Sequence, residues 1–474
     1  TNNYAIYHPD NGTLKIQDSA TVSGKGGIQM CSGTLNISGS PKIEALGKAD
    51  HETGAAGPIY DIAAISVVNR GYPGGAPVVT IKGTPTVTAN EGEVIHAYTW
   101  SNNAESVWAE AGDNINVSGG TYSKTFNDAY LAADCTLVPS GDMYTVEQKP
   151  VAEYNGTKYT SLSQAIHDAN MAGGTVKLLD NVTLTNSLGI GGTAKVTLDL
   201  NKKILTLDGA QIYTQGSATV TINNGTIKRT DVPTSGSANN FAIQVMSGSS
   251  LFLGAGIGST YKVTLESTYG IYNVGGTLTV RYATINTDGW SIAVSDSASK
   301  TGEVYIGRGM GGNTKTVITS ESGNVLGTMV GSKPNVTVDY GTLTSNGTAW
   351  DAGVIYWASE GTLTITGGIF NASSVEGSTA AAVYQKNGTV KISGVTTKLL
   401  GNKALVVEAG EGSTGTMVTE LSGGKFSTWP DEAWVVEGKE IHVTDGLYVV
   451  EGPYVVEVTL EDGTVRGFDS WSKA

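Results

Sequence analysis

A few acidic residues of this 474-residue chain stand where they could act on a sugar bond. Asp288 lies in the segment "NTDGW", and Asp199 and Asp208 lie in "TLDLN" and "TLDGA". A glycoside hydrolase needs two carboxyl groups roughly 5 to 10 Å apart, and a lyase groups carboxylates around Ca²⁺ beside a basic residue. Asp199 and Asp208 could meet across adjacent strands, but a short Asp side chain at a strand end more often caps a turn. We therefore predict no catalytic residue and no enzyme.

The segment "NTDGW" is similar to the first part of the motif of polygalacturonases. That motif continues with a second Asp after the Gly, a paired Asp, a Gly-His-Gly and an Arg-x-Lys. Here Trp290 and Ser291 follow the Gly, and none of the five histidines has glycine on both sides. The similarity is confined to Asp288, which we interpret as a turn residue.

The segment "ADHETG" places three possible metal ligands, Asp50, His51 and Glu52, next to one another in a Gly- and Pro-bearing excursion over about residues 44–76. Consecutive side chains of an extended chain point apart, so these three cannot readily share one ion. No spacing typical of zinc ligands, of a phosphate-binding loop or of a Ser/His/Asp set occurs. We predict neither a metal nor a cofactor.

Aromatic residues recur at matching positions of repeated segments. In "GIY", "VIYW" and "AVY", strand alternation that buries the aliphatic residue turns the following tyrosine outward. The aliphatic residues are Ile271, Ile355 and Val383, and the tyrosines are Tyr272, Tyr356 and Tyr384. Earlier segments hold Tyr7, Tyr213 and His96 at this position, the last followed by Tyr98 and Trp100, while Trp290 and Trp357 lie nearby.

Strands stacked about 4.8 Å apart would align these rings in a broken ladder on one outer face. Flat rings on a rigid face suit the apolar faces of sugars, so we predict a glycan platform of Tyr272, Tyr356, Tyr384, Trp290, Trp357, His96, Tyr98 and Trp100. The alternative also stands, because aromatic residues pair between neighbouring strands for stability alone.

The elements that must position these rings follow from composition and period. Gly supplies 64 residues and only 15% of the residues are charged, a mixture typical of turns and strands. Segments such as "AIYHPDNGTLKIQ", "GIYNVGGTLTVRYATI" and "AVYQKNGTVKISG" share an apolar and aromatic pair, a Gly or Asn turn and a period-two strand. Units of about twenty residues with two or three strands predict an all-β solenoid, a right-handed parallel β-helix.

One stretch has helical period instead. In "SLSQAIHDANMAGG", Ser161 can cap the N-terminus, apolar residues fall on one face, and Gly173 can end the helix. We predict a cap helix over 161–172 that covers the open strand edges of the first coil of a module.

A closing hairpin also repeats, since the segment from Val117 aligns without a gap to that from Leu421 at an offset of 304 residues. Its aromatic residues, Tyr122, Phe426, Tyr130, Trp434, Tyr144 and Tyr448, are predicted to plug the end of each module.

These features predict a domain order. We expect the C-terminal part of a first module over residues 1–148, a complete second module over 149–453, and a linking strand with the start of a third module over 454–474. The final "GFDSWSKA" matches "KYTSLSQA" at Lys158 and so predicts the start of a third cap helix. We interpret the chain as a length of a longer repeated array, with any export signal outside it.

The order of these segments carries a resemblance. A cap helix, the segment "GGTVKLLDNVTL", Gly-rich coils and a closing hairpin resemble the parallel β-helix modules of large secreted surface proteins of gut-type Firmicutes. The resemblance covers essentially the whole chain and implies a fold shared with pectate lyases and polygalacturonases. It implies architecture more specifically than activity, because one fold hosts many functions.

Two cysteines, Cys31 and Cys135, lie 104 residues apart. Five or so intervening coils would separate them by roughly 24 Å, whereas a disulfide needs Cα atoms within about 7 Å. We expect two free buried thiols unless the end of the first module folds back.

The function that we predict is an extracellular repetitive protein, secreted or on the cell surface, that acts as an adhesin or stalk with a weak carbohydrate-binding face. Its partners would be glycans or host or microbial surface glycoproteins. Two alternatives stay open, namely a polysaccharide lyase or glycoside hydrolase of β-helix type and a structural spacer that binds nothing. A net charge of −14 without a Lys/Arg cluster argues against nucleic acid, and no apolar run nears the eighteen residues of a membrane span.

Overall fold

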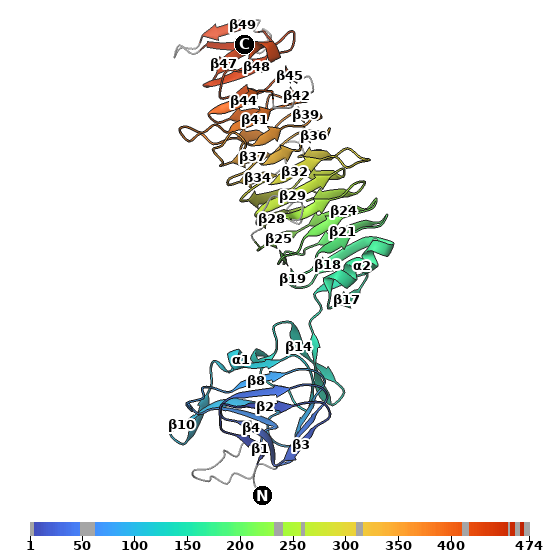
Figure 1. Cartoon of the computed structure of the whole chain (residues 1–474), viewed down its shortest axis with the longest axis vertical. Coiled ribbons are helices and arrows are strands. Elements are labelled where there is room, and N and C mark those ends of the chain that lie inside the picture. The colour runs from blue at the N-terminus through green and yellow to red at the C-terminus, as the bar shows by residue number, and fades with distance from the viewer. Residues whose placement is uncertain are drawn as a thin grey trace. The chain divides into compact units, whose positions relative to one another are not determined.

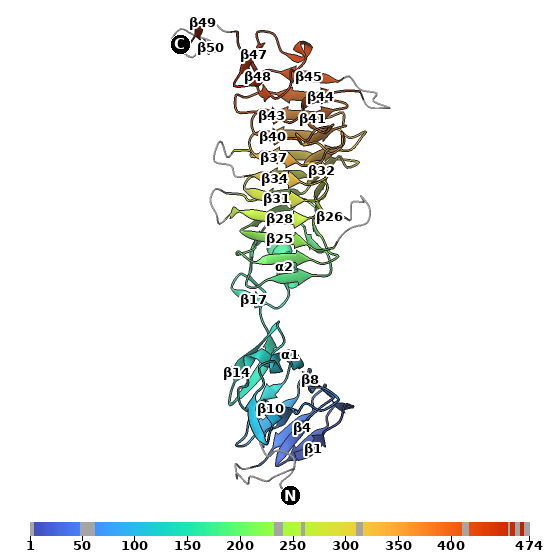
Figure 2. The same cartoon turned by 90° about the vertical axis from the view of Figure 1, so that its left-hand side faces the viewer.

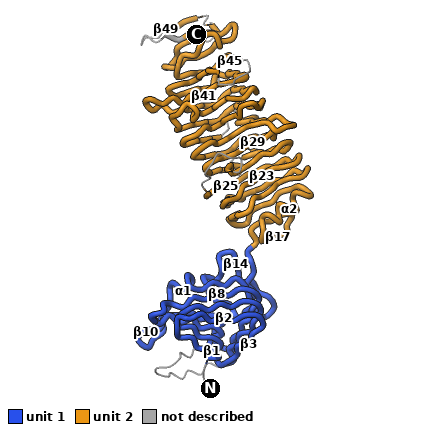
Figure 3. The backbone as a smooth tube through the Cα atoms, viewed as in Figure 1, with its two compact units in different colours: residues 1–149 blue, residues 150–474 orange. Residues whose placement is uncertain are grey.

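The computed structural model describes residues 4–47, 62–231, 240–256, 261–309, 316–409, 417–453, 456–459 and 465–468. The chain divides into two compact units, residues 1–149 and 150–474 (Figure 3). Both units are stacks of short parallel strands, so the predicted parallel β-helix is confirmed. No helix among the described residues is long and apolar enough to cross a bilayer.

The first unit has three sheets, A, B and C, which successive strands visit in turn. Sheet A contains β1 (Tyr4–His8), β4 (Gly26–Met30), β7 (Ile65–Asn69), β10 (Ile95–Ser101) and the antiparallel β11 (Ala104–Val107). Sheet B contains β2 (Thr13–Ile16), β5 (Thr34–Ile37), β8 (Val78–Ile81) and β12 (Ile115–Val117). Sheet C contains β3 (Thr21–Gly24), β6 (Lys42–Ala45), β9 (Thr86–Ala89), β13 (Thr121–Tyr122), β15 (Met143–Gln148) and β14 (Cys135–Ser140). Two short helices, α1 (Ala111–Asn114) and a 3-10 turn (Asp128–Tyr130), precede the closing hairpin.

The second unit repeats this plan in sheets D, E and F, and from β18 to β46 each strand pairs with the strand three later in the chain (Figure 1). Sheet D contains β17 (Thr157–Tyr159), β16 (Ala152–Tyr154), β18 (Gly174–Leu178), β21 (Lys195–Asp199), β24 (Thr219–Asn223), β27 (Ser250–Leu253), β30 (Thr277–Val280), β33 (Glu303–Ile306), β36 (Asn335–Val338), β39 (Thr362–Ile365), β42 (Thr389–Ile392) and β45 (Val418–Leu421).

Sheet E contains β19 (Val182–Leu184), β22 (Ile204–Leu207), β25 (Gly225–Arg229), β28 (Val263–Ser267), β31 (Ala283–Thr287), β34 (Val317–Ser320), β37 (Thr342–Ser345), β40 (Ile369–Asn371), β43 (Lys398–Leu400), β46 (Lys425–Phe426), β48 (Leu447–Glu451) and β47 (Glu440–Thr444). Sheet F contains β20 (Leu188–Ile190), β23 (Ile212–Thr214), β26 (Phe241–Val245), β29 (Tyr269–Val274), β32 (Ile292–Ser295), β35 (Leu326–Thr328), β38 (Ile355–Trp357), β41 (Ala381–Gln385) and β44 (Lys403–Val407).

Rows of aliphatic side chains fill the interior of the second unit. One row in sheet F consists of Leu188, Ile212, Ile243, Ile271, Ile292, Leu326, Ile355 and Val383, aligned from strand to strand. Each of these side chains is at most 2% exposed. Full burial of one such side chain contributes about 1.5 to 3 kcal/mol, so stacked rows hold each coil to the next.

The cap helix is present as predicted. α2 (Leu162–Ala172) begins after Ser161, whose hydroxyl accepts a hydrogen bond from the Gln164 amide at 3.4 Å, and ends at Gly173 with φ 76°. Its buried face consists of Leu162, Ala165, Ile166 and Ala169. The helix packs on β16, β18 and β20 at the first coil of the second unit (Figure 2).

The closing hairpins are confirmed too. In the first unit β14 and β15 are antiparallel and β15 continues sheet C, and in the second unit β47 and β48 are antiparallel and β48 continues sheet E. Tyr122 and Phe426 are fully buried, as expected of residues that plug the ends. A 3-10 turn (Glu432–Trp434) precedes the second hairpin.

Beyond the second hairpin, β49 (Val456–Thr459) and β50 (Val465–Phe468) form a two-stranded antiparallel sheet, like the β16–β17 pair before α2. The expected third cap helix falls after Phe468, outside the described residues. Cys31 and Cys135 are both buried and free, which confirms the prediction of two thiols.

Candidate functional site

One row of outward positions runs along sheet F. The register aligns Gly189, Tyr213, Gln244, Tyr272, Ala293, Gly327, Tyr356, Tyr384 and Val406. The three predicted tyrosines therefore share a row, and Ile271, Ile355 and Val383 beside them are fully buried, as strand alternation predicts. Ala293 and Gly327 interrupt the row and separate Tyr272 from the other two tyrosines.

Trp290 lies over this interruption. A Cβ added at Gly327 would meet the Trp290 ring at 2.9 Å, so the absence of a side chain at Gly327 makes room for the indole. Tyr272 packs instead on Phe241, with ring centroids 5.3 Å apart, and its hydroxyl forms a hydrogen bond of 3.2 Å with that of Ser295. Both contacts stabilise the sheet itself. For Tyr272 they therefore favour the alternative in which aromatic residues pair between strands for stability alone.

The densest group of rings lies farther along the row. Tyr356 and Tyr384 stack with centroids 6.1 Å apart and planes inclined by 30°. Trp350, from the loop before β38, packs on both, with centroids 5.9 Å from Tyr356 and 5.8 Å from Tyr384. We call Trp350, Tyr356 and Tyr384 the aromatic cluster. Trp350 is 45% exposed, so it is the ring that a ligand can reach most fully.

A hollow of about 350 Å³ adjoins the aromatic cluster. Its lining combines rings, a hydroxyl and charged groups, namely Trp350, Thr379, Tyr384, Lys386, Lys403, Val406 and Glu408. Small-molecule sites are concave and combine apolar walls with a few polar groups, and this size is at the lower end of their range. The hollow can accommodate a unit such as one sugar ring.

Two charged side chains, Lys386 and Glu408, contact the rings of the aromatic cluster. Lys386 Nζ lies 4.6 Å from the centroid of the Trp350 ring and 5.1 Å from that of Tyr384, a cation–π geometry. The Tyr384 hydroxyl donates a hydrogen bond to Glu408 Oε2. Burial, together with this hydrogen bond and the charge of Glu408, raises the pKa of Tyr384 to about 12. Burial and the charge of Asp351 raise the pKa of Tyr356. Both phenols are therefore neutral at physiological pH.

Three predicted platform residues, Trp357, Tyr98 and Tyr384, are buried, and the prediction that they form an accessible platform is wrong. Tyr384 is 5% exposed, so only a small part of its ring reaches the hollow. Trp357 is fully buried, because it follows the outward Tyr356 and so points into the interior. Tyr98 is 1% exposed, since it packs with Cys31 and Val68 in a small cluster that Tyr72 and Trp100 adjoin.

His96 and Trp100 lie on β10 of the first unit and form no ladder with the tyrosines of sheet F. The His96 ring lies 4.6 Å from that of Tyr98, and its Nε2 lies 3.2 Å from Glu105 Oε1. Gln29 and Ser66, which align between Tyr7 and His96 in sheet A, are fully buried. The described residues of the first unit, 4–47 and 62–149, therefore hold no aromatic row of the predicted kind.

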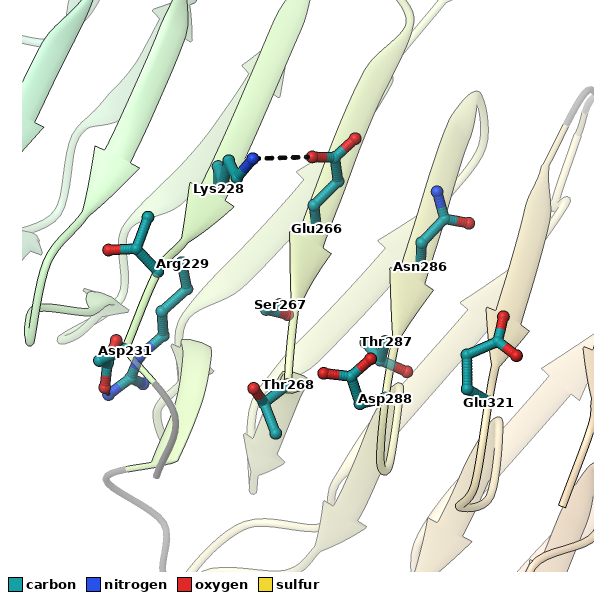
Figure 4. A pocket seen from close by; sticks show the side chains of 11 residues that line it. Lys228, Arg229, Asp231, Glu266, Ser267, Thr268, Asn286, Thr287, Asp288 and Glu321 are labelled. Carbon is teal, nitrogen blue, oxygen red and sulfur yellow. Dashed lines mark hydrogen bonds and ion pairs between the residues drawn. The ribbon is translucent and has the colours of Figure 1, made fainter. Parts of the chain in front are cut away.

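A second group of functional side chains gathers on sheet E. A hollow of about 390 Å³ is lined by four carboxylates, Asp231, Glu266, Asp288 and Glu321, and by the basic Lys228 and Arg229 (Figure 4). Asp288 and Glu321 directly follow β31 and β34, so they belong to neighbouring coils and both line this hollow. Sequence reasoning singled out Asp288 alone, because the register that brings Glu321 beside it is set by an intervening loop.

The two basic groups of this hollow are already engaged. Arg229 donates two hydrogen bonds to the Asp231 carboxylate, at 2.6 and 2.8 Å, and a third of 2.8 Å to the Phe241 carbonyl. These hydrogen bonds and the charge of Arg229 lower the pKa of Asp231. Lys228 Nζ lies 4.0 Å from Glu266 Oε2. Asp288 and Glu321 are thus the carboxylates of the hollow without a basic partner among the described residues.

The remaining predicted candidates have plain roles or are not described. Asp199 accepts hydrogen bonds from the Asn201 amide at 2.8 Å and from Asn224 Nδ2 at 2.9 Å, which confirms a turn cap. Asp208 is exposed and follows β22 of sheet E, whereas Asp199 ends β21 of sheet D, so the two do not meet across adjacent strands. Asp50, His51 and Glu52 lie outside the described residues. Within the described ranges, no three His, Cys, Asp or Glu side chains could share a metal ion.

Comparisons with protein-family models, with curated proteins and with solved structures found no match for this chain.

Proposed function

We propose that the chain belongs to an extracellular surface protein that binds saccharides weakly through the aromatic cluster. The observation that carries this proposal is the half-exposed Trp350 packed on stacked Tyr356 and Tyr384 beside a hollow with polar groups. Aromatic faces match the apolar faces of sugar rings, and the Thr379 hydroxyl and the lysine ammonium groups that line the hollow can orient sugar hydroxyl groups. The resemblance to secreted surface-protein modules supports the extracellular location.

Weak binding is sufficient for such a role. A site formed by one exposed ring and one shallow hollow buries little of its ligand, so single contacts are short-lived. Repeated modules in one protein raise the effective concentration of sites and can increase avidity by a factor of about 10² to 10⁴. An adhesin or stalk gains attachment in this way without a deep pocket.

A glycan array tests the proposal. The purified chain is expected to bind a subset of saccharides, and Trp350→Ala is expected to lower that affinity about two- to tenfold, since an aromatic contact is worth roughly 0.5 to 1.5 kcal/mol. Trp429→Ala is the matched control, because Trp429 is an equally exposed indole of the same unit that packs on Tyr448 near the closing hairpin. A blank array would contradict the proposal and leave a spacer that binds nothing, and equal loss in both variants would show that the aromatic cluster is not the binding site.

One observation favours a second candidate, cleavage of a polysaccharide. The hollow on sheet E gathers four carboxylates and two basic residues, and Asp288 and Glu321 follow strands of neighbouring coils. A pair of carboxyl groups is the minimum for acid–base work on a glycosidic bond.

Release of reducing ends from pectin, mucin and related polymers tests this candidate. Activity that is lost in both Asp288→Asn and Glu321→Gln would support it, and activity that survives in both would place the chemistry elsewhere. No activity on any polymer would leave binding at the aromatic cluster as the function.

A further inference from the structure

Two lysines line the hollow beside the aromatic cluster. Lys386 follows β41 directly, and Lys403 begins the neighbouring strand β44, where it aligns with Ala381. Lys386 stands five residues after Ala381, the residue with which Lys403 aligns. The Cα atoms of Lys386 and Lys403 therefore lie roughly 16 Å apart along the strand direction. Both side chains nevertheless line one hollow, so each can present its ammonium group to a ligand there.

These two ammonium groups differ from the lysines on the outer faces of the same unit that are ion-paired. Three of those lie beside a glutamate of the neighbouring coil, in the pairs Lys228–Glu266, Lys333–Glu360 and Lys391–Glu420. Among the described residues, Lys386 and Lys403 have no carboxylate within ion-pair distance. Lys386 is instead held over the rings of Trp350 and Tyr384, which fixes its position without neutralising it.

The acidic group of the hollow is already engaged. Glu408 accepts the hydrogen bond of the Tyr384 hydroxyl, so part of its capacity as an acceptor is taken by the protein. The lining thus contains two ammonium groups and one carboxylate, a local excess of positive charge in a chain whose net charge is −14. Because the whole chain repels anions at long range, such a local excess matters only for a ligand that reaches the hollow itself.

We propose that the aromatic cluster with Lys386 and Lys403 binds an anionic saccharide, one that carries carboxylate or sulfate groups, in preference to its neutral form. This inference rests on the proposed saccharide binding and adds the class of ligand. The sugar ring stacks on Trp350, and the ammonium groups donate charge-assisted hydrogen bonds to the anionic groups.

Saccharides with and without anionic groups test the inference, and the closest matches are lactose with sulfated lactose and trigalacturonate with its methyl ester. The probes are lactose, sialyllactose and sulfated lactose, together with trigalacturonate and its methyl ester, titrated calorimetrically into the full chain. The charged forms are expected to bind at least about tenfold more tightly than the neutral ones, and less tightly as salt is raised. A preference for sialyllactose and trigalacturonate identifies a carboxylate ligand, and a preference for sulfated lactose identifies a sulfated one.

Substitutions of the two lysines then test whether their charges bind the anionic groups. Lys403→Gln and Lys386→Gln are each expected to weaken binding of the charged probe several-fold, and to weaken it more than they weaken binding of its neutral form. Lys391→Gln is the matched control, because Lys391 is an outward lysine on β42 that is paired with Glu420 at 2.9 Å. Circular dichroism before each titration shows that the variants are folded.

The outcomes separate this inference from the one that it rests on. Equal binding of charged and neutral probes, with loss in Trp350→Ala, overturns the anionic class and keeps saccharide binding. Preference for charged probes that survives in both lysine variants overturns the assignment of the site. If neither the probes nor a glycan array shows binding, both proposals fail.

Discussion

Sheets E and F of the second unit are built from the same coils, yet their outer faces carry different chemistry. On sheet F the outward row collects Tyr356 and Tyr384, and a loop adds Trp350. On sheet E the residues after the strands collect carboxylates such as Asp288 and Glu321. The inward rows of both sheets are buried and serve stability. The coil therefore sets the spacing of about 4.8 Å, and the outward residue types alone set what each face can bind.

This difference is local to a few coils. Farther along the same sheet F row, Ala293 and Gly327 replace the rings, and Trp290 covers the gap. A parallel β-helix thus offers many equivalent outward positions, of which a few neighbouring ones form a site. Substitutions that separate packing from binding can test this comparison.

The largest effect is expected where an inward ring is removed. Trp357→Ala should lower the free energy of unfolding by about 3 to 5 kcal/mol, because Trp357 is fully buried between the coils. Urea denaturation followed by circular dichroism measures the change. If this variant were as stable as the native chain, the inward rows could not be what holds the coils together.

The next effect is expected at the buried end of the sheet E hollow. Arg229→Met should cost about 1.5 to 3 kcal/mol at neutral pH, because it removes the hydrogen bonds to Asp231 and to the Phe241 carbonyl.

The cost of Arg229→Met should also depend on pH. The folded state lowers the pKa of Asp231, so the ion pair contributes its full stability above the unfolded pKa of about 3.9 and loses it as the pH falls through the lower folded value. The difference in the free energy of unfolding between native chain and variant, measured in parallel denaturation curves, should therefore stay constant from pH 7 down to about pH 5 and shrink below the unfolded pKa of about 3.9. A difference that stays constant below that pKa as well would mean that the carboxylate is not involved.

A smaller effect is expected at the gap in the aromatic row. Gly327→Ala should cost about 1 to 3 kcal/mol, because the new methyl group would stand 2.9 Å from the Trp290 ring. The double variant with Trp290→Ala should recover part of that loss, and thermal unfolding of the single and double variants measures the coupling. Strict additivity of the two substitutions would show that the indole does not lie over Gly327.

The smallest effect on stability is expected for Trp350→Ala, within about 0.5 kcal/mol, since Trp350 is 45% exposed and lies in a loop. The same variant is expected to lose saccharide binding. The unfolding midpoints of Trp350→Ala and Trp357→Ala in urea are compared. The comparison distinguishes a ring that binds ligand from a ring that packs in the core, although the two tryptophans are only seven positions apart in the chain. A large loss of stability would show that the aromatic cluster is a packing device.

Much of the fold could be predicted because its signals are local. Turn residues, period-two strands and the cap at Ser161 are each visible within about twenty residues. The same alternation rule that turns Tyr356 outward also places Trp357 inward, so the burial of Trp357 followed from the pattern and the platform prediction overlooked it. Trp350 was missed because it stands in a loop outside the repeated pattern, where no period assigns a direction.

The amino-acid sequence by itself determined the architecture, since a repeated apolar pattern can bury its side chains only by stacking one turn on the next. It also determined the cap helix, the closing hairpins and the free thiols. Only the tertiary structure decided which side chains become neighbours across coils, as Trp350 with Tyr384 and Asp288 with Glu321 do. The physical reason is that loops of unequal length lie between the strands, so the contacts depend on strand register and loop path, which no local pattern encodes.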